Sequence, residues 1–190
     1  MAARLSVLSL AAAALLPAAA RAGELGLGPG PDIIVSWTPP DASGNITFKT
    51  SCYPHAGEGD IAWCAWGIAP TPGMNPANVF WFSLTAKDAP FAVEDRAITA
   101  MAQPPCIKTQ LTHTTAMSFN KTSGVLEFEF TRPAKVSAAQ EKLGYISFAD
   151  KLQFVVGAIG GKTRPTKKCD VTQAEHYGAF TYISVNFFSP

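Results

Sequence analysis

The sequence lacks the short motifs that mark most enzyme active sites. It has no Gly-x-Ser-x-Gly turn, no glycine-rich phosphate loop and no His-Glu-x-x-His helix. Its Asp and Glu residues show no spacing that suggests a catalytic pair, and charged residues make up only 15% of the chain. We therefore expect no enzyme activity from this chain alone, so that catalysis would need a separate partner.

The sequence also lacks an excess of positive charge. It has 15 Lys and Arg residues and 14 Asp and Glu residues, which gives a formal net charge of +1. Residues 1–22 include Arg4 and Arg21, so 13 basic residues oppose 14 acidic ones in the rest of the chain. Binding to nucleic acid through phosphate contacts needs clustered Lys and Arg. We therefore expect no nucleic-acid partner.

Long apolar runs are missing after the first 22 residues. No later stretch reaches the roughly 18 apolar residues that a membrane span requires. Residues 1–22 themselves combine a basic start with an apolar run at 5–16, a break at Pro17 and small residues up to Ala22. This pattern is typical of a secretory signal peptide, since the run is too short and too interrupted for a membrane anchor. We predict a secreted protein in which residues 23–190 form one domain.

The four cysteines form no Cys-x-x-Cys motif, and the wide, irregular sequence spacings between them are unlike those of zinc sites. An even number of cysteines in an exported protein is most simply explained by disulfides. Four cysteines allow three pairings, and the sequence does not choose among them. We therefore predict two disulfides of unknown pairing among Cys52, Cys64, Cys106 and Cys169.

Two Asn-x-Ser/Thr sequons follow the predicted signal peptide. Asn45 begins Asn-Ile-Thr and Asn120 begins Asn-Lys-Thr. Such sequons accept N-linked glycans on the surface of exported proteins. We therefore predict glycosylation at both positions in a host that glycosylates.

Turn-forming residues separate many short β-rich runs. The chain has 15 glycines and 15 prolines, and the run 125–130 alternates apolar and polar residues with a period of two. Only 137–143 has the pattern of a helix. We predict an all-β fold, an antiparallel β-sandwich of about ten strands. The expected strands are 33–37, 46–52, 61–68, 79–84, 91–98, 108–111, 116–119, 125–131, 152–158 and 180–187.

Several of these runs together resemble the DOMON domain family. The segment 61–74 reads IAWCAWGIAPTPGM, a strand of the form Trp-x-Ala-Trp-Gly-Ile followed by a Pro/Gly loop and a Met. In the same order come VEDR at 93–96, LEFEFTRP at 126–133, a hydrophobic strand at 154–158 and His176. The resemblance covers about residues 32–188. It implies an immunoglobulin-like β-sandwich with a ligand pocket.

The cytochrome branch of that family binds haem b between a Met and a His. Carried over to this sequence, the resemblance implies Met74 and His176 as axial ligands of the haem iron. A thioether and an imidazole fill both axial positions, which favours electron transfer over catalysis. The absence of Cys-x-x-Cys-His predicts that the haem is held without covalent attachment. The expected function is that of a one-electron carrier with a separate redox protein as partner.

Other interpretations remain open. Met74 could pack against the core, and His176 could bond a backbone carbonyl. The domain could also be a haem-free module that binds a carbohydrate or a protein through aromatic residues such as Trp63 and Trp81. Asp95 and Arg96 are expected to form an ion pair or to bond a neighbouring loop, and Arg132 could steer an acidic partner or a haem propionate.

Overall fold

The computed structural model describes residues 23–28, 32–54, 61–73, 75–99, 105–161, 164, 167–169 and 183–189. The predicted signal peptide at 1–22 lies outside the described residues, as do Met74 and His176. None of the helices within these ranges is long and apolar enough to cross a membrane.

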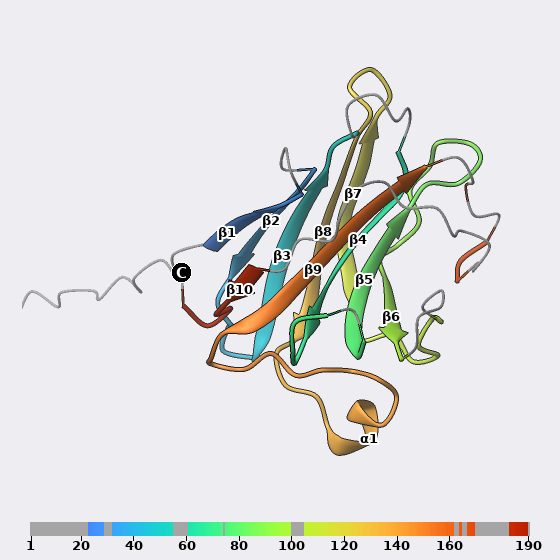
Figure 1. Ribbon diagram of the computed structural model, residues 1–190. Coiled ribbons are helices and arrows are strands. Elements are labelled where there is room, and N and C mark those ends of the chain that lie inside the picture. The colour runs from blue at the N-terminus through green and yellow to red at the C-terminus, as the bar shows by residue number, and fades with distance from the viewer. Residues whose placement is uncertain are drawn as a thin grey trace, which may run out of the picture.

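Ten strands form two antiparallel five-stranded sheets that pack face to face (Figure 1). This arrangement confirms the predicted all-β sandwich. In spatial order, the first sheet consists of β1 (Gly23–Leu27), β2 (Ile33–Thr38), β3 (Asn45–Cys52), β8 (Val125–Pro133) and β7 (His113–Asn120). The second sheet consists of β10 (Ile183–Val185), β9 (Gln153–Gly161), β4 (Ile61–Ala69), β5 (Ala77–Ser83) and β6 (Glu94–Ile98).

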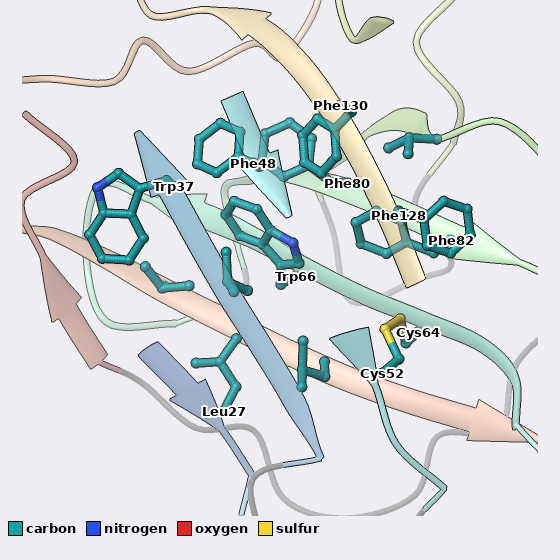
Figure 2. Close-up of a cluster of buried hydrophobic side chains, with 14 of the residues drawn as sticks. Leu27, Trp37, Phe48, Cys52, Cys64, Trp66, Phe80, Phe82, Phe128 and Phe130 are labelled. Atoms are coloured by element: carbon teal, nitrogen blue, oxygen red, sulfur yellow. A yellow bond between two sulfur atoms is a disulfide. The ribbon is translucent and has the colours of Figure 1, made fainter. Parts of the chain in front are cut away.

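Aromatic side chains fill the space between the two sheets (Figure 2). Phe48 of β3 lies at the centre and is fully buried. Large rings supply much apolar area in one contact, and tilted or edge-on pairs suit their charge distribution. Five other ring centroids lie 5.1 to 5.9 Å from that of Phe48, namely those of Trp66, Phe80, Phe130, Phe148 and Phe187.

Both predicted disulfides are formed, and the structure gives their pairing. Cys52 on β3 bonds to Cys64 on β4, so this disulfide joins the two sheets through the core. Cys106 bonds to Cys169 across 63 residues of sequence. Cys106 also forms an isolated β-bridge with Arg96, which places this second disulfide at the β6 edge of the second sheet.

The strands that were predicted differ from the structure in two places. The segment 108–111 was expected to be a strand, but it is irregular. The Gln110 amide there bonds the backbone of Asp95, accepting from its N–H at 2.6 Å and donating to its carbonyl at 3.1 Å, so a side chain takes the place of a strand partner. Conversely, β1 was not predicted, because its glycines indicate a turn. It forms because Leu25 and Leu27 are buried and because Gly23 leaves room for the Trp37 ring.

The helix prediction at 137–143 is confirmed in part. Helix α1 (Ala138–Glu141) is a single turn that lies beyond one end of the sandwich (Figure 1). Ser137 is its N-cap and forms a capping box with Gln140. The helix buries no residue and takes no part in the core.

Candidate functional site

Strands β4, β5 and β6 of the second sheet are buried on both of their faces, although only one face packs against the first sheet. Every residue of β4, β5 and β6 is buried, whereas β3 and β8 of the first sheet alternate between buried and more exposed residues. Side chains in a strand alternate between the two faces. We use "outer face" for the side that points away from the first sheet. It carries Trp63, Ala65, Gly67, Ala69, Ala77, Val79, Trp81, Glu94, Arg96, Ile98, Phe154, Val156 and Ala158.

Small apolar residues form the middle of the outer face. Gly67 of β4 lies between Val156 of β9 and Val79 of β5, and Ala65 lies next to Ala158. A Cβ at position 67 would come within 2.3 Å of the Asn78 carbonyl oxygen, so the two strands approach too closely there for any side chain. The middle of this face is therefore a shallow, apolar floor.

Aromatic and charged residues occupy one end of the outer face. The rings of Trp63 and Trp81 stack with centroids 4.2 Å apart and planes 17° apart. The Arg96 guanidinium lies 4.5 Å above the Trp81 ring and forms a buried ion pair with Glu94, with Nη2 2.7 Å from Oε2. Glu94 also accepts the backbone N–H of Cys169 at 2.7 Å. These contacts tie β4, β5 and β6 to the second disulfide.

One polar atom at this end has no hydrogen-bond partner. The Trp63 indole nitrogen is buried, and no acceptor bonds its N–H. Leaving a buried donor unpaired costs about 1–3 kcal/mol. Such an atom on an apolar face is a place where the oxygen of a ligand would be stabilised.

A different polar network lies on the inner side of β6. The Asp95 carboxylate is fully buried and accepts the backbone N–H groups of Leu111 at 2.9 Å and Thr112 at 2.8 Å, together with the Thr112 hydroxyl at 2.7 Å. The Tyr145 hydroxyl lies 3.3 Å from the same carboxylate and also donates to the Thr109 carbonyl. Burial raises the pKa of Tyr145, and the charge of Asp95 raises it further.

Arg132 belongs to the core, and the prediction that it could steer a partner was wrong. Its side chain is 0% exposed, and its Nη2 donates to the Ile146 carbonyl at 2.8 Å. Burial lowers the pKa of Arg132 to about 10, while the charge of Asp95 acts in the opposite direction. The period-two pattern of β8 could have predicted this burial, because Arg132 falls on the same face as Phe128 and Phe130.

The predicted axial ligands, Met74 and His176, fall outside the described residues, so only their flanking anchors can be placed. Met74 belongs to the connection between Ala69 of β4 and Ala77 of β5, which both lie on the outer face. His176 lies between Cys169 at the β6 edge and Ile183 of β10, which pairs with β9 at the opposite edge.

The remaining candidate residues are all on described segments. Asn120 is exposed at the end of β7, and Asn45 is half-buried at the start of β3. None of the four tryptophans is more than 5% exposed. The aromatic residues that were expected to contact a carbohydrate are therefore not on the surface.

The fold has solved counterparts, although a comparison of the sequence with known protein families and with curated proteins gives no match. The cytochrome domain of Myriococcum thermophilum cellobiose dehydrogenase is similar at a TM-score of 0.63 and 13% identity, over 89% of this chain and 84% of that one. The cytochrome b domain of pyranose dehydrogenase from Coprinopsis cinerea is similar at a TM-score of 0.57 and 11% identity, over 83% and 77%. This chain therefore has the fold of the DOMON-type cytochrome domains, which confirms the fold that the sequence resemblance implied.

Proposed function

We propose that this chain is an exported electron carrier that binds haem b on the outer face of its second sheet, with Met74 and His176 as axial ligands. The observation that carries the proposal is the outer face itself, an apolar surface buried on the side away from the first sheet. The similarity in fold to two cytochrome domains supports the same function.

The residues of the outer face fit a haem. A flat macrocycle needs a floor of small apolar side chains, which Ala65, Gly67 and Val79 supply. Its carboxylates need a donor, and Trp63 has one that is buried and unpaired. Held by Met74 and His176, a haem would supply a one-electron couple and leave no position for a substrate.

Chain connectivity supports the two proposed ligands. The connection that contains Met74 starts and ends on outer-face residues, Ala69 and Ala77. Between Cys169 and Ile183 the chain has to return from one edge of the second sheet to the other, a separation of four strand spacings or about 19 Å. His176 is the middle residue of that stretch. Each proposed ligand therefore belongs to a segment whose described ends lie on the second sheet or at its edge.

The proposed setting is outside the cell. The predicted signal peptide would direct export, and the two disulfides are compatible with an oxidising compartment. Both structural neighbours are cytochrome domains of dehydrogenases, so we infer an oxidoreductase as the redox partner.

The absorption spectrum of the purified protein, before and after addition of haem, tests the proposal. We expect sharp low-spin bands in the reduced native protein. His176→Ala should lose the haem, and Met74→Ala should lower the reduction potential or open a coordination position. His113→Ala and Met117→Ala are matched controls, because both residues are exposed on β7. Absence of low-spin bands in haem-supplemented native protein would reject the proposal, and unchanged bands in both ligand variants would reject these two ligands.

The alternative is a haem-free module that binds a carbohydrate or a protein. Stacking on a sugar ring needs an exposed aromatic face, and the four tryptophans are at least 95% buried. The structure therefore gives this alternative less support. Binding of the haem-free protein to an insoluble polysaccharide, abolished by Trp81→Ala, would favour it.

A further inference from the structure

Trp63 is one of two tryptophans whose indole N–H is buried without a partner, and the two lie in different surroundings. Trp37 belongs to the core between the sheets, where its ring centroid lies 5.1 Å from that of Phe187. Trp63 belongs to the outer face, where it stacks on Trp81. The unpaired donor of Trp37 thus belongs to the cluster between the sheets, whereas that of Trp63 belongs to the cluster on the proposed ligand-binding face.

The outer face changes in polarity along the strands. At the end where β4 meets the Met74 connection, Ala69 and Ala77 lie beside Phe154 and Ile98, and all four side chains are apolar. At the other end lie the unpaired N–H of Trp63 and the Arg96–Glu94 ion pair. Haem has the same asymmetry, because its only strongly polar substituents are two carboxylates on one edge.

We propose that the Trp63 indole N–H donates a hydrogen bond to a haem carboxylate and so sets the orientation of the haem on the outer face. This inference rests on the proposed haem-binding function. Glu94, the carboxylate at this end, already accepts hydrogen bonds from Arg96 and from the Cys169 backbone. It lies on β6, on the far side of Trp81 from Trp63, so it is not the partner of the Trp63 N–H. A haem carboxylate would remove the cost of the unpaired donor, because a hydrogen bond to a charged acceptor is among the stronger ones.

The test replaces the indole nitrogen and little else. Incorporation of 3-benzothienylalanine at position 63 puts sulfur in place of the N–H and keeps the bicyclic ring, so the stack on Trp81 is retained. The same replacement at position 37 is the matched control, because that N–H is also buried and unpaired. Trp63→Phe and Trp37→Phe form a second pair, in which both variants lose ring volume. Unfolding of each haem-free protein by urea reports whether the fold is intact.

We expect the replacement at position 63 to raise the dissociation constant for haem about tenfold, the factor to which 1.4 kcal/mol corresponds. The replacement at position 37 should leave it unchanged. Haem dimethyl ester, which lacks the carboxylate charges, supplies a readout that a packing role would not move. The native protein should prefer haem to the ester, and the replacement at position 63 should reduce that preference about tenfold.

The outcomes separate this inference from the proposed function. Native protein that binds no haem would overturn both. Native protein that binds haem, with an unchanged dissociation constant and ester preference after replacement at position 63, would overturn the role of Trp63 alone. Equal weakening at positions 63 and 37 would also overturn it, since a general loss of packing would then explain the result.

Discussion

Asp95 and Arg96 are neighbours in sequence, but their side chains belong to opposite faces of β6. Asp95 pairs across the sheet with Phe80, whose ring is in the core, and bonds the loop at Leu111 and Thr112. Arg96 pairs with Val79 on the outer face and forms its buried ion pair with Glu94. Of the two alternatives expected from sequence for Asp95, the bond to a neighbouring loop is confirmed. One strand thus separates a structural network from the candidate binding face.

The buried charges of Asp95 and Arg132 should be energetically coupled. Asp95→Asn removes the carboxylate that accepts from the loop and whose charge favours protonated Arg132. We expect it to lower the free energy of unfolding by about 3–5 kcal/mol, since it leaves a buried charge uncompensated. Arg132→Met should cost less, because it removes the buried charge along with two nitrogens, Nε and Nη1, that have no hydrogen-bond partner. The double variant should be more stable than the sum of the single effects predicts, as urea unfolding would measure.

Lys49 and Glu129 provide the control for this double-mutant cycle. Their ion pair, at 3.2 Å, is on the surface, with the lysine side chain 70% exposed. Exposed pairs of this kind contribute about 0.2–1 kcal/mol. A coupling energy between Asp95 and Arg132 no larger than that of the surface pair would contradict the proposed coupling.

Tyr145 should make the fold sensitive to alkaline pH. Its pKa is raised by burial above the ordinary value of 10.0. Below pH 10 the group is protonated in the folded and unfolded chains, so its contribution to stability is fully present there. Above pH 10 the unfolded chain loses the proton first, and stability falls by up to about 1.4 kcal/mol per pH unit. Urea unfolding from pH 8 to pH 11 should show a shallower fall for Tyr145→Phe than for the native protein.

Tyrosinate absorbance gives an independent check of the same group. Because Tyr145 stays protonated near pH 10, Tyr145→Phe should leave the absorbance rise at that pH unchanged. A smaller rise in the variant would mean that Tyr145 ionises like an exposed tyrosine.

Strand periodicity and turn residues were enough to predict the sandwich, because they act locally. Phe48, Phe128 and Phe130 alternate with polar residues and are buried as expected. The disulfide pairing could not be predicted, since it depends on β3 of one sheet meeting β4 of the other. The segment 108–111 failed for a related reason, because its structure is set by Asp95, a residue distant in sequence.

The candidate site was predictable only in part. Trp63 and Trp81 were recognised as aromatic candidates, but their stacking and the unpaired N–H depend on the register between β4 and β5. The outer face as a whole gave no local signal, because a strand buried on both sides reads as an unbroken apolar run. Met74 and His176 rest on family resemblance and stay predictions.

Gly67 should be intolerant of any side chain. A Cβ there would lie 2.3 Å from the Asn78 carbonyl oxygen and 2.8 Å from the Val79 Cα, and backbone atoms cannot move aside as a side chain can. We expect Gly67→Ala to lower the free energy of unfolding by about 3 kcal/mol, at the upper end for overpacking. Gly44 is the contrast, because it needs its φ of +78° but has no neighbour within 4 Å of a Cβ.

Gly44→Asn should therefore change stability by no more than about 0.5 kcal/mol, since asparagine tolerates the left-handed region and the site is open. Thermal unfolding of both variants measures the difference. A Gly67→Ala protein as stable as Gly44→Asn would show that β4 and β5 can separate at little cost.

The two sequons should differ in occupancy if the protein passes through a glycosylating secretory pathway. Asn120 is exposed, whereas Asn45 is half-buried and its backbone N–H donates to the Asp41 carboxylate at 2.9 Å. We expect Asn120 to be modified more completely. Intact mass of Thr122→Ala and Thr47→Ala, which each remove one sequon and keep the Asn, assigns the glycans. Equal occupancy at both positions would contradict the role of exposure.

The two disulfides should have separable effects. Loss of Cys52–Cys64, which closes a loop of 12 residues, should lower the free energy of unfolding by about 3 kcal/mol. Loss of Cys106–Cys169, which closes a loop of 63 residues, should lower it by about 4 kcal/mol.

The Cys106–Cys169 disulfide also fixes Cys169, which precedes His176 in sequence, at the edge of the proposed haem site. Replacing both cysteines of that pair by serine should therefore weaken haem binding, as titration with haem in the absence of urea would measure. The Cys52/Cys64 double serine variant, which alters only the core between the sheets, should keep its haem affinity, and an equal loss in the two would show that the second disulfide acts through overall stability alone.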